Sequence, residues 1–234
     1  DPRTLRRSSR DVEPPRANAT RHRSGAAVLS RSHPSSIDAT LRAMANDLAP
    51  GFLVASPVLQ DPNFSRSVVL LVDHRSEGSL GFIVNRPADI DFGDVVEELG
   101  LEHGRTGPPR VPVLLGGPVS PRTGWIVYGQ DALGDDESGT IAVTDQIRVS
   151  ASREQLEQLA LLPNAGRHLL VLGYAGWGAG QLDEEIKQGA WIPVELDEEV
   201  IFGAPFEERW QRALSAAGLD PRMVVGGLGG TTEN

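Results

Sequence analysis

Strand-length runs of apolar residues constrain this chain more than any other feature. Residues 67–74 contain five consecutive aliphatic positions, 68–72, and residues 168–172 form a second such run. A continuous apolar run of this length is typical of a β-strand that is buried on both faces. Neither run approaches the ~18 residues of a membrane-spanning helix. We therefore expect a fold built around buried β-strands, with no membrane partner.

Turn residues divide the rest of the chain into further short strands and helices. The pattern predicts strands over residues 51–56, 67–74, 82–85, 111–115, 125–128, 140–143, 146–149, 168–173 and 191–196. It predicts four helices, which begin near Asp91, Ser152, Gln181 and Phe206. The glycine-rich segment 173–180 is predicted to be a loop. Because strands often follow one another directly, we expect an α+β fold. Its mixed, largely antiparallel sheet could curl into a barrel, flanked by about four helices.

The charge is unevenly distributed along the chain. The first 47 residues carry nine arginines and five acidic residues, a net charge of +4, whereas the remainder carries −14 of the total of −10. Residues 1–43 are rich in Arg, Ser and Pro, and we expect them to be a disordered extension. This extension could be a transit peptide, a nucleic-acid-binding tail or a segment upstream of a natural start at Met44. The start at Met44 is favoured, with residues 44–234 forming a single domain.

Composition excludes several classes of function for that domain. Its acidic surface repels phosphate backbones, which disfavours direct nucleic-acid binding outside a local basic groove. The chain has no cysteine, so disulfides and thiolate metal sites are excluded, and a reducing, cytoplasmic location is expected. His74, His103 and His168 show no paired spacing. We therefore predict no metal site and no cofactor.

Two segments carry residue types that could support chemistry. The glycine-rich segment 173–180 could place a phosphate at a helix N-terminus. However, acidic residues 183–185 open that helix and would repel an anion, so a tight turn that lets Trp177 pack is favoured. Glu184 and Glu185 are predicted to be solvated. Ser67, His74 and Asp61 are the components of a nucleophilic triad, but no G-x-S-x-G elbow frames the serine. Structural roles are favoured, and no catalytic residue is predicted.

Several blocks also occur in a specific order. They are 51–57 (GFLVASP), 61–68 (DPNFSRSV), His74, Gly81, 85–87 (NRP), 116–119 (GGPV), 173–182 (GYAGWGAGQL), 185–186 and Trp191. Together, over about residues 48–219, these blocks resemble the bacterial YqgE/AlgH family. The resemblance implies a compact α+β domain in the bacterial cytosol, with no assigned catalytic residue. The family's label as transcriptional regulators comes from a genetic association with alginate regulation, not from a DNA-binding motif. Arg75 departs from the Asn often found after the matching His.

Polar and glycine residues gather at the predicted strand ends, where binding loops sit on rigid scaffolds. We predict that a ligand-binding surface is formed by Arg66, His74, Asn85, Arg86, Gly176, Trp177, Gly180 and Gln181. These residues are expected to share one concavity that takes an unidentified small molecule or protein partner. The first hypothesis is thus a non-enzymatic binding or regulatory domain. The alternatives are an enzyme, either a hydrolase or nucleotide-using, and a direct DNA-binding regulator that uses the Arg-rich tail.

Overall fold

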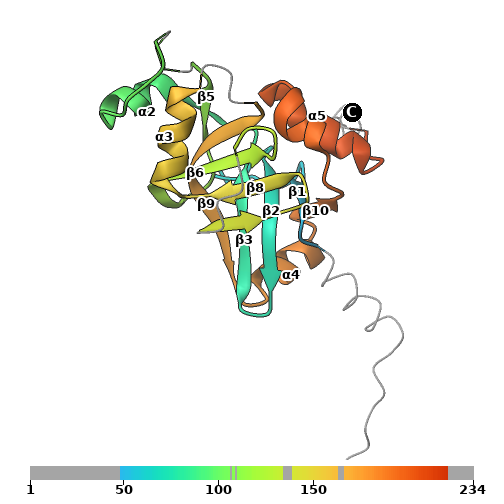
Figure 1. The fold of residues 1–234 in the computed structure, drawn as a ribbon. Coiled ribbons are helices and arrows are strands. Elements are labelled where there is room, and N and C mark those ends of the chain that lie inside the picture. The colour runs from blue at the N-terminus through green and yellow to red at the C-terminus, as the bar shows by residue number, and fades with distance from the viewer. Residues whose placement is uncertain (1–47, 106, 109, 134–138, 163–165, 221–234) are drawn as a thin grey trace, which may run out of the picture. The chain divides into compact units, whose positions relative to one another are not determined.

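The computed structural model describes residues 48–220, except for 106, 109, 134–138 and 163–165 (Figure 1). The predicted extension over residues 1–43 and the start at Met44 lie outside the described residues. Within the described part, ten strands combine with four α-helices and one π-helix. The predicted α+β class is confirmed.

The strands, in chain order, are β1 (Gly51–Ala55), β2 (Val68–Arg75), β3 (Gly78–Ile83), β4 (Pro87–Asp91), β5 (Pro112–Leu115), β6 (Val119–Gly129), β7 (Thr140–Ala142), β8 (Ile147–Ser150), β9 (His168–Gly178) and β10 (Trp191–Val194). The α-helices are α2 (Phe92–Glu98), α3 (Arg153–Leu161), α4 (Gln181–Lys187) and α5 (Phe206–Ala216), and the π-helix is η1 (Glu199–Gly203). None of these helices combines the length and apolar character needed to span a bilayer.

Strand β9 joins the two parts of the sheet. Its first part lies between parallel β5 and antiparallel β6, whereas its last part, 175–178, pairs with β3. The main path runs β10-β1-β2-β3-β9-β6-β8-β7, with β4 and β5 branching from β9. The β5–β9 pair is parallel and the other pairs are antiparallel. The sheet is therefore mixed and largely antiparallel, as predicted, and it curls into a half-barrel with open ends.

The glycine-rich segment after residue 172 is not a loop, as the sequence predicted, but the second half of β9. Gly173 adopts φ +70° and marks the change of partner along the strand. A Cβ at Gly173 would lie 2.6 Å from the carbonyl oxygen of Gly117. A Cβ at Gly117, which adopts φ +151°, would lie 2.3 Å from the carbonyl of Tyr174. Glycines are required here because two backbones touch, and cross-strand pairing overrides their low strand propensity.

The apolar run in β2 is buried on both faces, as its sequence predicted. Val68 and Leu70 belong to a core that also contains Trp210 and Leu214 of α5. Val69 and Leu71 belong to a second core, with Leu182 of α4. A third core lies under α2 and α3, and includes Phe92, Val96, Ile126, Leu159 and Leu170. Helices thus cover both faces of the sheet around β2 (Figure 1).

Replacing Gly173 by alanine tests the backbone contact at the bend of β9. We expect Gly173→Ala to lower the free energy of unfolding by about 3 kcal/mol, because backbone strain and overpacking add. Gly180→Ala is the matched control: Gly180 has nearly the same φ, +71°, but nothing lies within 4 Å of its added Cβ. Its loss should be about 1 kcal/mol. Equal losses in urea denaturation would contradict the role given to the bend.

Candidate functional site

The structure divides the predicted ligand-binding residues into two groups, at opposite ends of β2. Arg66 lies two residues before the start of β2, and Asn85 and Arg86 follow β3 beside it. His74 lies near the other end of β2. Gly176, Trp177, Gly180 and Gln181 lie around that same end, because residues 176–178 of β9 pair with β3 next to His74. Eight extended residues span roughly 26 Å. Arg66 and His74 therefore do not share the single concavity expected from the sequence, although the Trp177 side chain reaches the loop before β2.

In the first group, two side chains attach the loop 61–67 to the end of β3. Asn85 accepts a hydrogen bond from the amide of Val68 (2.8 Å) and donates one to the carbonyl of Arg66 (2.9 Å). The Arg86 guanidinium donates to the carbonyls of Pro62 (3.3 Å), Asn63 (2.6 Å) and Ser65 (3.2 Å). Arg86 thus binds backbone oxygens instead of pairing with Asp61. These contacts hold the loop in one conformation.

Arg66 itself has an unusual backbone. It adopts φ +55°, although it is not a glycine, and its guanidinium carbon lies 5.8 Å from the centre of the Trp210 ring. Trp210 is in turn held by a 2.8 Å hydrogen bond from its indole nitrogen to the carbonyl of Ala55. Arg66 is therefore an exposed cation that lies over a fixed aromatic ring.

Sequence reasoning missed one arginine next to this group. Arg209 is 2% exposed, and its guanidinium donates to the carbonyls of Ala204 and Val84. It also lies over the ring of Phe206, 4.3 Å from the ring centre. Burial lowers the pKa of Arg209 to about 10. The signal available in the sequence was weak, because Arg209 is simply one of several charged residues on an amphipathic helix.

In the second group, the Glu185 carboxylate joins three side chains. One of its oxygens accepts hydrogen bonds from the indole nitrogens of Trp177 (2.9 Å) and Trp191 (2.8 Å). The other accepts from the Gln181 amide (2.8 Å), whose own oxygen accepts from the backbone N–H of Gly178 (3.1 Å). The prediction that Glu185 is solvated is wrong, because α4 turns it toward the two indoles. The carboxylate ties α4 to the ends of β9 and β10.

An aromatic contact connects the two groups. Phe64, in the loop 61–67, stacks on Trp177 with ring centres 6.2 Å apart and meets the edge of Trp191 at 5.4 Å. Trp177 is 6% exposed. The sequence favoured packing of Trp177 over a phosphate site in this segment, and the buried indole agrees with that packing. The indole fills a core position, so it contributes little surface to any ligand.

His74 faces α4 from the β2–β3 hairpin. Its Nδ1 lies 2.7 Å from the hydroxyl of Ser79, its Nε2 lies 3.6 Å from Asp183, and its side chain is 8% exposed. Ser67 lies at the opposite end of β2, is buried, and donates its hydroxyl proton to the carbonyl of Phe64 (2.7 Å). The pairing of Ser67 with His74 that a triad would need is therefore absent. His74 pairs with Ser79 instead, which sequence reasoning did not consider.

An open hollow lies on the other face of the same hairpin. It has a volume of about 580 Å³, and its lining includes Leu80, Val119, Tyr174 and Gly176, together with Asp73, Arg75 and Glu77. Leu80 and Tyr174 pack against the core that α5 covers, so this face is opposite to the one that His74 shares with α4. Asp73 and Arg75 form an ion pair of 2.8 Å. Of the predicted residues, Gly176 and Trp177 line this hollow.

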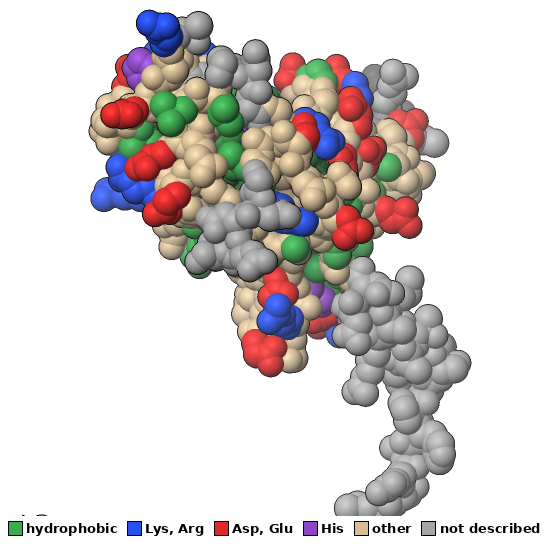
Figure 2. Space-filling view, viewed as in Figure 1, with side chains coloured by type: hydrophobic (Ala, Val, Ile, Leu, Met, Phe, Trp, Pro, Cys, Tyr) green, Lys and Arg blue, Asp and Glu red, His purple; other side chains and the backbone are tan. Residues whose placement is uncertain are grey.

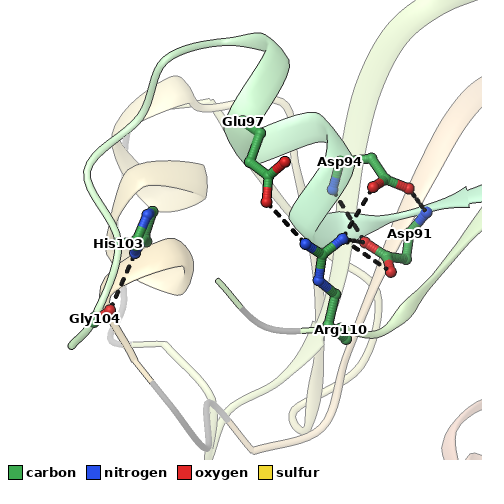
Figure 3. Close-up of polar contacts among 6 residues, drawn as sticks. All are labelled: Asp91, Asp94, Glu97, His103, Gly104 and Arg110. Carbon is green, nitrogen blue, oxygen red and sulfur yellow. Dashed lines mark hydrogen bonds and ion pairs between the residues drawn. The ribbon is translucent and has the colours of Figure 1, made fainter. Parts of the chain in front are cut away.

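A third polar cluster surrounds Arg110 at the start of α2 (Figure 3). Arg110 forms ion pairs with Asp91 (3.0 Å), Asp94 (2.9 Å) and Glu97 (2.8 Å). Asp91 and Asp94 also form a reciprocal capping box. The four side chains are 32–57% exposed, so the cluster anchors the surface segment around Arg110 to α2. In the part of the chain that the structure describes, no three His, Cys, Asp or Glu side chains are grouped to hold a metal ion.

Removing Arg110 should change the titration of Asp94. Its pKa is held below the usual value, first by the hydrogen bond from the Asp91 amide and then by Arg110. We expect Arg110→Ala to raise the pKa of Asp94 only part of the way back, because the amide bond remains. A lowered pKa stabilises the fold above the unfolded-state pKa, and this contribution is lost as the pH falls. NMR titration of the carboxyl carbons measures this pKa. An unchanged pKa of Asp94 in Arg110→Ala would contradict the role given to Arg110.

Comparison with known proteins agrees with this architecture. A family model described as AlgH-like matches residues 52–222. A UPF0301 protein of Anaeromyxobacter sp. (strain Fw109-5) is 42% identical over 190 residues, which cover 79% of this chain and 96% of that protein. A UPF0301 protein of Paracoccus denitrificans (strain Pd 1222) is 36% identical over 180 residues, covering 76% of this chain and 94% of that protein.

Solved structures show the same fold. The solution structure of the AlgH protein from Pseudomonas aeruginosa matches with a TM-score of 0.60 and 29% identity, covering 80% of this chain and 96% of that chain. A crystal structure from Corynebacterium diphtheriae matches with a TM-score of 0.56 and 24% identity, covering 71% of this chain and 85% of that chain, and supports the fold alone. The resemblance predicted from the ordered sequence blocks is confirmed: the chain belongs to the AlgH-like (UPF0301) family.

Proposed function

We propose that this chain is a non-catalytic binding domain with a regulatory role, which acts through a ligand or partner held in the hollow beside β3 and β9. The observation that carries the proposal is the hollow itself. Its volume of about 580 Å³ falls within the ~300–1,000 Å³ of typical small-molecule sites. Its lining combines an aromatic ring and aliphatic side chains with a few charged groups, which is the composition of such sites.

Polar residues outside the hollow support a binding role over a catalytic one, because their hydrogen bonds hold the scaffold together. Asn85 and Arg86 hold backbone groups of the loop 61–67. Glu185 accepts three hydrogen bonds from neighbouring side chains. These internal hydrogen bonds restrict the conformations of the side chains and of the loop. A restricted scaffold keeps the hollow preformed. A preformed site loses less conformational entropy on binding.

The charge of the domain supports a regulatory role that does not depend on direct DNA contact. Residues 48–234 carry a net charge of −14, and Figure 2 shows acidic side chains gathered on the side where α5 lies. Such a surface repels nucleic-acid phosphates. The regulatory part of the proposal follows the label of the AlgH family. Regulation would then act through a bound metabolite or protein, without direct contact to DNA.

Blocking the hollow tests the binding role. We expect purified full chain, screened by thermal shift against nucleotides and central metabolites, to be stabilised by at least one compound. Gly176→Leu should abolish that stabilisation, because its side chain would enter the hollow from β9, where the nearest contact of a Cβ is the Tyr174 ring at 3.2 Å. Gly124→Leu is the matched control, since its Cβ meets only one side-chain atom, at 3.8 Å.

Two results would count against this proposal. One is a ligand whose stabilisation survives Gly176→Leu undiminished. The other is sequence-specific duplex binding by the full chain in fluorescence anisotropy at physiological salt. We expect only weak duplex binding that falls with salt and shows no sequence preference.

A second candidate function rests on the Ser79–His74–Asp183 contacts. The Ser79 hydroxyl lies 2.7 Å from Nδ1 of His74, and Nε2 of the same ring lies 3.6 Å from Asp183. In this arrangement the hydroxyl could attack an acyl carbon while its proton passes to Nδ1 and Asp183 stabilises the imidazolium. His74 would return the proton to the leaving group, and water would then hydrolyse the acyl-serine. The 92% burial of the His74 side chain beneath α4 favours the structural role, in which it anchors α4 to the hairpin.

A fluorophosphonate probe distinguishes the two roles, because it labels only activated serines. For a structural role we expect no labelling of Ser79 in the full chain, and His74→Ala should lower the free energy of unfolding by about 1–3 kcal/mol through the lost hydrogen bond. Labelling that maps to Ser79 by peptide mass spectrometry and disappears in His74→Gln would establish the hydrolase alternative and overturn the non-catalytic proposal.

A further inference from the structure

Three arginines gather around one short stretch of backbone, at the end of β2 away from the hollow. Arg86 lies in this stretch, Arg209 donates to the carbonyl of Val84, and Asn85 bonds the carbonyl of Arg66. Among the residues that the structure describes, none of the three guanidinium groups forms an ion pair with a carboxylate. Most other arginine contacts of the domain are ion pairs, such as those of Arg110, Arg153, Arg167 and Arg212.

In a domain with an acidic net charge, the lack of carboxylate partners for these three arginines among the described residues needs a physical reason. Like charges repel, and a guanidinium is costly to bury without an opposing charge. Arg209 is 2% exposed, and burial lowers its pKa to about 10, so it stays protonated at neutral pH. Asp61, the acidic residue of the adjacent loop, accepts a hydrogen bond from the amide of Asn63 instead of facing Arg86. The three guanidinium groups therefore keep their positive charge without a carboxylate partner among the described residues.

The backbone of Arg66 is a second, independent observation. The amides of Phe64 and Ser65 both bond the carbonyl of Asp61, so the loop forms a single helical turn. Arg66 follows that turn in the left-handed conformation, a position that glycine normally occupies. A non-glycine residue there costs about 1–2 kcal/mol, and such strain concentrates at functional sites. An exposed arginine held over Trp210 at this position calls for a role of its guanidinium.

We infer that Arg66 is an anion-binding position that takes an oxyanion, the phosphate or carboxylate group of a ligand. Arg66 supplies the exposed donor, since its guanidinium lies over the Trp210 ring while its backbone is fixed by Asn85. Arg86 holds the loop 61–67, and Arg209 links α5 to the backbone of Val84. A planar guanidinium matches both oxyanions through paired hydrogen bonds. This site is separate from the hollow and does not depend on the proposed function.

NMR titration of the ¹⁵N-labelled full chain with inorganic phosphate tests the site, with chloride replaced at constant ionic strength. We expect saturable shifts of the Arg66 amide and the Trp210 indole signal. Arg66→Gly removes the guanidinium but suits the left-handed backbone, so the variant should fold with an unchanged or raised unfolding midpoint. Its phosphate affinity should fall at least about tenfold, which corresponds to one charge-assisted hydrogen bond. Arg122→Ala, at an exposed arginine of β6, should titrate like the wild type.

A parallel titration with acetate distinguishes the two sources of the oxyanion. Saturation by both anions assigns a carboxylate-tolerant site, whereas saturation by phosphate alone assigns a phosphate site. The inference is overturned if neither anion gives saturable shifts at Arg66 and Trp210. It is also overturned if Arg66→Gly titrates like the wild type. Neither result bears on ligand binding in the hollow, which Gly176→Leu tests separately.

Discussion

The contact between the bend of β9 and the turn at 116–117 is the constraint on which the rest of the structure depends. At Gly173 the strand leaves the neighbourhood of β5 and begins to pair with β3. Any side chain at Gly173 or Gly117 would enter the opposing backbone. Without this close approach, one strand could not belong to both parts of the sheet, and the half-barrel would open. The hollow beside Gly176 exists because β9 continues past the bend.

Many polar side chains in this fold form hydrogen bonds to the backbone or to one another. Side chains engaged in this way support the scaffold and are not available to bind a ligand. Asn85, Arg86 and Glu185 each form at least two hydrogen bonds to backbone or side-chain groups. Phe64 then links the loop that Arg86 holds to the indoles that Glu185 holds. The loop before β2 and the end of β9 are thus in direct contact through these aromatic rings.

Local signals in the sequence predicted much of the fold. The apolar run of β2, the cap at Asp91, and the glycine at the end of α4 act over a few residues, so they can be read without tertiary contacts. The glycine-rich half of β9 was mistaken for a loop, since only its pairing with β3 makes it a strand. The strand β4, which begins at Pro87, was missed for the same reason: its single partner, β5, lies more than twenty residues further along the chain.

The residue pattern indicates the α+β class and the family, because these depend on periodicity, turn chemistry and the order of motifs, but it indicates few of the residues that line the hollow. The grouping of the site residues depends on tertiary contacts. The length of β2 separates His74 from Arg66, α4 turns Glu185 inward, and α5 brings Arg209 and Trp210 to the loop before β2. These groupings join residues as much as 155 positions apart. They arise from burial of apolar faces against each other, which no local pattern of residues encodes.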